Sequence, residues 1–426
     1  MQQRPSSSRQ ASAGLRPSSG AQRRSSHTGQ GARAPKRKEP ARALQAGGVV
    51  LGKQSKRFRL FSSRSGLDLP FLLLLLTLVV IGLIMLFSAS YANAYYNTGS
   101  SFTYILRQGI FAVVGVGIAI LLSYMDYHIL RKFALVGIIA SWGLLAVTLV
   151  LPATNNVHRW INLGIFTFQP SEIAKFALIL WFAHYISLNF KKMNTFRTGI
   201  IPNLIVVAIT VGLVVLEPHF SASIILLSIS GIMLFIGGVK KRWFAIVLAV
   251  VAVGALVVLL SGNYATDRIM GWLNPFDPPT GVDTWQTRNS LYAIGSGGWM
   301  GVGLGQSRQK YLWLPEPQND FIFAIVCEEL GFVGALLIVL LFALLVWRGI
   351  VISLRAKDKF GMLLGVGLIA QVGIQVVLNI GVVTNTIPNT GISLPFFSYG
   401  GTALIIMLAQ MGILLSISRS STIEKT

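Results

Sequence analysis

The sequence predicts an all-α polytopic membrane protein with ten transmembrane helices and one large extracytoplasmic loop between the seventh and eighth helices. Three observations support this fold class. The chain of 426 residues is 53% hydrophobic and only 12% charged, whereas a soluble domain carries about 25% charged residues. Apolar runs of roughly the 20 residues that cross the hydrocarbon follow one another. Lys and Arg are concentrated in alternate loops, as in membrane proteins of fixed orientation.

Residues 1–66 predict a disordered, basic cytoplasmic tail. They are rich in Ser, Arg, Gln, Gly and Ala and show no apolar periodicity, so they cannot bury enough surface to offset their ordering entropy. Of the 36 Lys and Arg, 15 lie in residues 1–64, against one acid, Glu39, so this tail carries +14 of the net charge of +22. Positive charge in the tails of membrane proteins is usually a topology signal, and we expect no nucleic-acid partner.

Ten apolar runs after the tail predict a membrane domain over residues 67–420, with a short cytoplasmic end at 421–426. The runs lie at about 70–90, 104–124, 129–151, 171–188, 200–216, 220–238, 243–262, 320–346, 360–383 and 399–418. Only Glu217, Pro218 and His219 separate the fifth run from the sixth. We expect two helices there, because a single bent helix would break the alternation of the loops.

The distribution of charge among the loops predicts the orientation. Loops with two or more Lys or Arg alternate with loops that hold almost none: residues 91–103 and 384–398 have none, and residues 152–170 have only Arg159. By the positive-inside bias, both termini are cytoplasmic and the long loop at 263–319 lies outside the cytoplasmic membrane. The single cysteine, Cys327, excludes an intrachain disulfide.

The long loop contains six glycines within residues 295–305. Such a run could cradle a phosphate through backbone N–H groups, although it matches neither the dinucleotide-binding nor the Walker pattern. Alternatively, it supplies turns that let the loop lie flat on the membrane. The sequence leaves both interpretations open.

Three acidic residues mark the start of the eighth run. Asp320 lies where the polar loop meets the apolar run, and Glu328 and Glu329 follow within it. An ionised carboxylate at the bilayer centre costs about 2.5 to 3.5 kcal/mol, which makes such residues functional candidates. Eight residues of helix are about 12 Å of rise, so Asp320 and Glu328 would not touch. The alternative is structural, with Asp320 as a helix N-cap and the glutamates in buried polar contacts.

A second polar cluster opens the fourth run. It comprises Arg159, Gln169, Ser171, Glu172 and Lys175. Ser171 could cap the helix, and the i, i+3 spacing of Glu172 and Lys175 places them on one face, where they would form an ion pair. Lys175 and Arg159 could instead bind a pyrophosphate on the outer side of the membrane.

Two further features lie within or next to apolar runs. Arg107, in the second run, has no acid nearby in sequence and needs a partner from another helix or a ligand. Pro and Gly residues interrupt the chain at 388–401, a segment that includes Ser398, Tyr399 and Gly400. Irregular backbone at membrane depth is tolerated where it lines a cavity or is buried in protein, so this segment is a candidate cavity wall or a plain re-entrant turn. The five histidines show no metal-ligand spacing.

Several segments resemble the SEDS family of cell-wall polymerases, the FtsW, RodA and SpoVE type. They are RWINLGIFTFQPSEIAKFAL, NPFDPPTGVDTWQTRNSLYAIGSGGWMGVGLG, LPEPQNDFIFAIVCEELGF and GISLPFFSYGG. The resemblance covers about residues 67–420. Pro317, Gln318 and Asn319 make it stronger for the division and sporulation members than for RodA. One departure is His219, since the family often has an acid after this proline.

The resemblance implies ten transmembrane helices and a peptidoglycan glycosyltransferase that polymerises lipid II on the outer face. Asp320 matches the essential family acid and would act as the general base or as a ligand of a divalent cation, Mg or Mn; no other cofactor is implied. Candidate substrate-binding residues are Arg107, Arg159, Gln169, Ser171, Glu172, Lys175, Glu328, Ser398, Tyr399 and Gly400. Implied partners are a class B penicillin-binding protein and other division or sporulation membrane proteins, at the division septum.

Two other functions remain open on the sequence alone. A lipid II flippase would also need intramembrane acids and broken helices, although no internal repeat is evident between the halves. A scaffold without catalytic activity could position and activate a partner cell-wall synthase.

Overall fold

The computed structural model describes residues 66–151, 159–162, 164, 167–243, 245–246, 249 and 263–421. The predicted tail and most of the predicted seventh helix lie outside these residues. The helices are α1 (Leu69–Thr98), α2 (Thr103–Tyr124), α3 (Ala134–Val150), α4 (Pro170–Asn189), α5 (Ile201–Leu216), α6 (Phe220–Ile236), α8 (Asn263–Leu273), α9 (Trp285–Gly297), α10 (Ile322–Leu354), α11 (Lys359–Val383) and α12 (Gly401–Ser420). Shorter elements are η1 (Tyr127–Phe133), η2 (Phe190–Lys192), η3 (Phe196–Ile200) and the antiparallel pair β1 (Ile161–Asn162) and β2 (Thr167–Phe168).

Within the described residues, eight helical segments are long and apolar enough to cross a membrane, and α6, with 17 residues, is a shorter apolar helix. The prediction of a multi-pass helical protein is therefore confirmed, whereas the count of ten spans is not tested. The prediction that α5 and α6 are separate helices is correct. The chain turns between them at Pro218, which has a positive φ of 27°.

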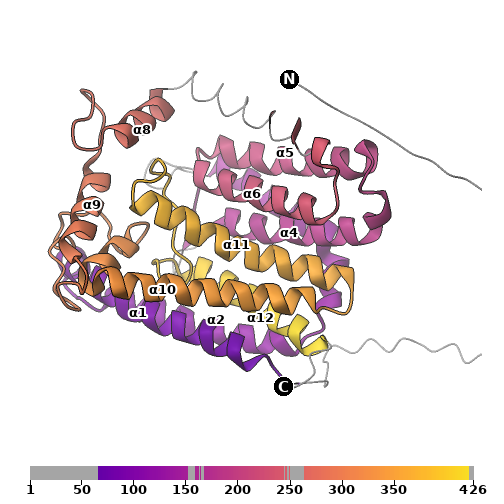
Figure 1. Cartoon of the computed structure of the whole chain (residues 1–426), viewed down its shortest axis with the longest axis horizontal. Helices are drawn as coiled ribbons and strands as arrows, with labels where there is room; N and C mark the ends of the chain where they lie inside the picture. Colours follow the sequence, from indigo (N-terminus) through magenta and orange to yellow (C-terminus); the bar gives the residue numbers. More distant parts are fainter. Residues whose placement is uncertain are drawn as a thin grey trace, which may run out of the picture. The chain divides into compact units, whose positions relative to one another are not determined.

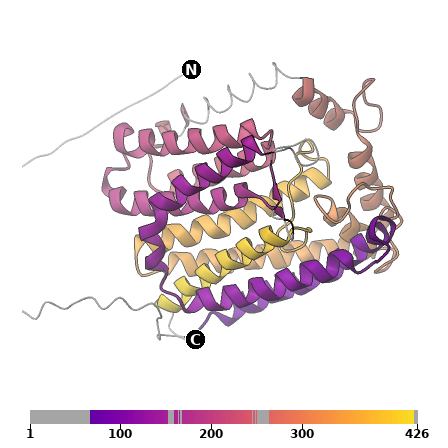
Figure 2. The same cartoon turned by 180° about the vertical axis from the view of Figure 1, so that it is seen from behind.

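The helices pack into one bundle whose centre is α11 (Figures 1 and 2). This helix lies against α10, α4 and α6, while α2 packs along α12 and α1 along α10. Close contacts depend on small residues: a Cβ at Gly365 would lie 2.5 Å from the Ser353 hydroxyl, and a Cβ at Gly367 would lie 2.5 Å from Ile179. Small residues let helices approach closely in a membrane, where lipid gives no hydrophobic drive for association.

Helix α10 is interrupted near its N-terminal end, at Gly331 (φ 68°, ψ −170°). The glycine-rich segment after α9 forms backbone hydrogen bonds with α10 on both sides of the break. Val302 and Gly303 donate backbone N–H groups to the carbonyls of Glu328 and Glu329 at 2.9 and 3.0 Å, and Phe332 donates to the Gly298 carbonyl at 2.9 Å. The sequence left a phosphate cradle or flat turns open for this segment, but the N–H groups of Gly301, Val302 and Gly303 are used within the chain.

Two helices inside the long loop, α8 and α9, were not predicted. Helix α9 packs against α10 at one end of the bundle (Figure 1). Helix α8 is tied to the segment after α11, because Trp272 and Asn385 exchange hydrogen bonds between side chain and carbonyl, at 3.0 and 3.1 Å. The loop thus contains helices, which were not predicted because its Gly, Pro and aromatic residues do not form a long apolar run.

Candidate functional site

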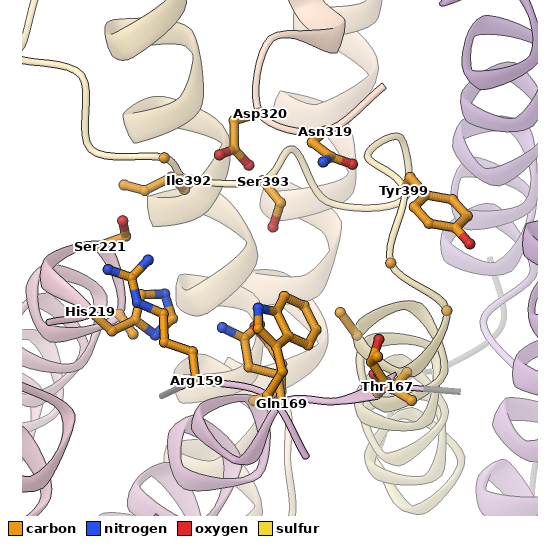
Figure 3. A pocket seen from close by; sticks show the side chains of 18 of the residues that line it. Arg159, Thr167, Gln169, His219, Ser221, Asn319, Asp320, Ile392, Ser393 and Tyr399 are labelled. Atoms are coloured by element: carbon orange, nitrogen blue, oxygen red, sulfur yellow. The ribbon is translucent and has the colours of Figure 1, made fainter. Parts of the chain in front are cut away.

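A cavity of about 700 Å³ lies among the N-terminal ends of α4, α6 and α12. Its wall also includes residues of α2, the β1–β2 hairpin, the segment before α10 and the irregular segment between α11 and α12. Figure 3 shows Asp320 and Asn319 on one side of the cavity and Arg159, Gln169 and Thr167 on the opposite side. Segments about 300 residues apart in sequence, from Tyr104 to Ala403, therefore meet at one site.

The backbone around Asp320 is fixed by hydrogen bonds from α11 and the irregular segment. Asn379 donates its side-chain N–H₂ to the carbonyls of Asp320 and Ile392, at 2.7 and 2.6 Å. The Ser398 hydroxyl donates to the Asn319 carbonyl at 2.7 Å, and the Tyr399 N–H donates to the Gln318 carbonyl at 2.8 Å. These bonds place Asp320 without using its carboxylate.

The Asp320 carboxylate forms no hydrogen bond with another described residue and faces the cavity. Helix α10 starts at Ile322 with no side-chain cap, so the alternative that Asp320 is an N-cap is not observed. Burial raises the pKa of this carboxyl to about 6, Glu316 adds to the rise, and Arg159 and Arg268 oppose it. A carboxyl with such a pKa is ionised near neutral pH and can still accept a proton, as a general base requires.

Basic side chains surround the cavity. Arg159 is held by the turn between α5 and α6, where its Nε donates to the Glu217 carbonyl at 3.1 Å and its Nη2 donates to the Pro218 carbonyl. Lys175, 2% exposed, forms an ion pair with Glu172 at 2.8 Å, and both residues line the cavity. The sequence left an ion pair or ligand binding open for Lys175, and the ion pair does not remove Lys175 from the cavity wall. An ammonium has three donors, so Lys175 has N–H groups left for a ligand.

The other predicted site residues divide into two groups. Arg107, Gln169, Tyr399 and Gly400 line the cavity. Arg107 forms no ion pair with any described residue. Gln169, rather than Ser171, is the N-cap residue of α4, so the expectation that Ser171 caps this helix is wrong.

Ser171, Glu328 and Ser398 do not line the cavity. Ser171 is fully buried, and Ser398 holds the backbone next to Asp320. The Glu328 carboxylate accepts from the Ser307 hydroxyl and from the Arg308 N–H at 2.9 Å. It anchors the outer loop to α10, away from the cavity.

Several cavity or supporting residues were not predicted. Gln375 lines the cavity, and with Gln371 and Asn379 it forms a stripe of amides four residues apart in an otherwise apolar helix. That spacing is a signal in the sequence. Glu316 and Arg268 lie on loop and α8 positions that nothing in the sequence distinguishes. Arg268 donates to the Asn389 carbonyl at 2.7 Å.

Comparisons with known proteins identify the family. The family model described as "Cell cycle protein", for FtsW, RodA and SpoVE, matches residues 68–423. Stage V sporulation protein E of Bacillus subtilis is 41% identical over 83% of this chain and 97% of its own length. A probable peptidoglycan glycosyltransferase FtsW of Geobacter metallireducens is 35% identical over 82% of this chain and 94% of its own.

Solved structures agree with this assignment. A chain from a peptidoglycan synthase complex that coordinates polymerization and crosslinking has a TM-score of 0.68 at 26% identity, covering 83% of this chain and 98% of its own. The rod shape determining protein RodA of Thermus thermophilus has a TM-score of 0.62 at 26% identity, covering 84% and 99%. The chain belongs to the FtsW, RodA and SpoVE family, and is more similar in sequence to these SpoVE and FtsW relatives than to RodA.

Proposed function

We propose that this chain is a peptidoglycan glycosyltransferase, which polymerises lipid II, an undecaprenyl-pyrophosphate disaccharide-pentapeptide, on the outer face of the cytoplasmic membrane. The observation that carries the proposal is the Asp320 carboxylate, which faces a cavity of about 700 Å³ across from Arg159. Relatives named peptidoglycan glycosyltransferase support the reaction type.

In the proposed reaction, a sugar hydroxyl attacks the anomeric carbon of a second lipid-linked sugar. The new carbon–oxygen bond forms as the bond to the pyrophosphate oxygen breaks. Asp320 takes the proton of the attacking hydroxyl as general base. Arg159 and Lys175 stabilise the negative charge that develops on the departing pyrophosphate. Arg107, which also lines the cavity, offers a further cation to the substrate.

A divalent cation at Asp320 is an alternative role for this residue. Mg²⁺ is often bound by one or two carboxylates together with substrate phosphates. Within the described residues, no group of three or more His, Cys, Asp or Glu side chains could hold a metal ion. In this alternative role, Asp320 would hold the cation together with the phosphates of the substrate.

The proposal includes the topology predicted by the loop charges. Ten helices would cross the membrane, with both termini in the cytoplasm and the loop at 263–319 outside, at the division septum. The proposed partner is a class B penicillin-binding protein, together with other division or sporulation membrane proteins. Support for a synthase partner comes from the similar chain that was solved within a peptidoglycan synthase complex.

Replacing Asp320 by Asn tests the function directly. Because the amide cannot take the hydroxyl proton, we expect glycan polymerisation by purified protein to fall by about 100-fold or more. The assay incubates lipid II with the protein, with and without the penicillin-binding partner, in Mg²⁺ or EDTA. The matched control is Asp277→Asn on the exposed outer loop, which should polymerise normally. Wild-type rates from the Asp320→Asn protein would remove this residue from the mechanism, and loss of activity only in EDTA would favour the metal role.

A further inference from the structure

His219 is a buried residue of the cavity wall that the mechanism above does not use. It occupies the N-cap position of α6, and its side chain points into the cavity (Figure 3). The residue is 9% exposed, and its Nδ1 is buried without a hydrogen-bond partner among the described residues. Because Nδ1 is enclosed, the other ring nitrogen, Nε2, is the atom left to bind a ligand in the cavity.

The imidazole is neutral in this position. Protonation of both ring nitrogens would place a charged N–H at Nδ1, where no described residue offers an acceptor, in a wall that already holds Arg159 and Lys175. Burial first, and then these two cations, lower the pKa of His219 to about 3. The neutral ring has one N–H, and the lower cost is to carry it on Nε2, which leaves Nδ1 as a bare acceptor.

The start of α6 presents further donors beside the ring. The first N–H groups of an α-helix have no partner within the helix. In α6 the first regular bond runs from the Ser223 N–H to the His219 carbonyl at 3.2 Å. Ser221 and Ala222, which precede it, line the cavity, and the first turn contains no acidic residue. Helix N-termini of this kind bind phosphate groups.

Arg159 belongs to the same unit of structure. Its guanidinium bonds to the carbonyls of Glu217 and Pro218, the two residues immediately before His219. The turn between α5 and α6 therefore fixes the cation, the imidazole and the helix N-terminus relative to one another. Arg159 also acts electrostatically on His219, and both residues line the cavity.

We propose that the N-terminus of α6 and the neutral His219 ring form a phosphate-binding subsite of the cavity, which takes a phosphate group of undecaprenyl pyrophosphate. The identity of this ligand rests on the proposed function. His219 donates one hydrogen bond to a phosphate oxygen, the α6 N–H groups donate others, and Arg159 supplies the charge.

The test measures binding to wild-type protein in nanodiscs of zwitterionic lipid. The probes are undecaprenyl pyrophosphate, undecaprenol and inorganic pyrophosphate. We expect His219→Leu to weaken the binding of undecaprenyl pyrophosphate by about tenfold or more, which is the effect of losing one hydrogen bond to a charged group. The affinity of this variant for undecaprenol should be unchanged. His219→Gln keeps an N–H donor, so its affinity for undecaprenyl pyrophosphate should be close to that of the wild type. His184→Leu on α4 is the matched control, because the Nδ1 of His184 also lacks a partner but the residue lies outside the cavity.

A second pair of variants tests the helix N-terminus. Ala222→Asp places a carboxylate in the first turn of α6, where it repels a phosphate. It should weaken the binding of undecaprenyl pyrophosphate far more than Ala222→Asn, whose side chain has the same size but no charge. Inorganic pyrophosphate separates a free-phosphate site from a lipid-linked one: competition by it at low concentration would show that the lipid is not needed.

Unchanged affinity of His219→Leu for undecaprenyl pyrophosphate, or an equal loss for undecaprenol, would overturn the subsite. Equal effects of the two Ala222 variants would do the same for the helix N-terminus. These outcomes are separate from the proposed function. A wild-type protein that binds through His219 but polymerises nothing would refute the function alone, whereas a polymerising protein with normal binding in His219→Leu would refute the subsite alone.

Discussion

Asp320 can act as a base only in its ionised form, so its pKa limits the pH range of the proposed reaction. Burial and the nearby Glu316 raise that pKa to about 6, against the pull of Arg159 and Arg268. The ionised fraction falls as the pH drops through this value. We therefore expect the rate of polymerisation to decline on the acidic side near pH 6, well above the usual range of an aspartate.

Replacing Glu316 by Gln should move this acidic limb. Loss of a like charge favours ionisation of Asp320, so its pKa falls and the rate persists to lower pH. Polymerisation rates measured between pH 5 and 8 would show the shift, with the plateau at neutral pH little changed. Asp277→Asn, on the exposed outer loop away from the cavity, should leave the profile in place. An acidic limb at the same pH in both variants would show that another group controls it.

At the scale of single residues, the sequence was most informative where a charge interrupts an apolar run. Asp320 and Lys175 were found because a charge at or within an apolar run requires a reason, and Arg159 because it is the single cation of residues 152–170; all three line one cavity. Glu328 shows the limit of that signal. The same cost of burial is met by hydrogen bonds from Ser307 and Arg308, so an intramembrane acid can be purely structural.

At the scale of elements, apolar length predicted the helices and failed at their polar ends. Helix α1 was expected to end near residue 90 but continues to Thr98, since polar residues outside the hydrocarbon can extend a helix. Helix α10 was expected over 320–346, and neither its break at Gly331 nor its extension to Leu354 was predicted. The break is matched by hydrogen bonds from residues 298–303, the backbone strap that follows α9. This is a long-range contact that local sequence patterns do not contain.

Gly301 is the position where this strap meets α10 most closely. Its φ is 80°, and an added Cβ would lie 2.2 Å from the Glu329 carbonyl oxygen. Gly305 has the same φ of 80° but open space around it. Gly305→Ala should therefore lose only the roughly 1 to 2 kcal/mol of a left-handed conformation. Gly301→Ala adds a backbone clash and should be clearly less stable. Thermal unfolding in detergent measures both, and equal losses would show that the strap can move aside.

At the scale of the whole molecule, buried polar networks join segments that are distant in sequence. Lys310, from the outer loop, is fully buried and pairs with Glu329 of α10 at 2.8 Å. Ser88 of α1 donates to the same carboxylate at 2.6 to 2.7 Å, and the Tyr91 ring lies 4.8 Å from the Lys310 ammonium. This network ties the loop that leads to Asp320 to two membrane helices.

Removing one member of this pair should cost more than removing both. Lys310→Met or Glu329→Gln alone leaves a buried group uncompensated, which typically costs about 3 to 5 kcal/mol, whereas replacement of both partners is often close to neutral. Unfolding of the two single variants and the double variant in detergent would give the coupling energy. The matched control is the pair of Arg348 and Asp68, at 2.8 Å, where Arg348 is 25% exposed and solvent screens the charge. Its coupling should be smaller. The network holds the outer loop in place but does not contact the Asp320 carboxylate. The double variant should therefore also recover part of the polymerisation activity that each single variant loses. Strictly additive losses of activity would mean that the two charges act independently.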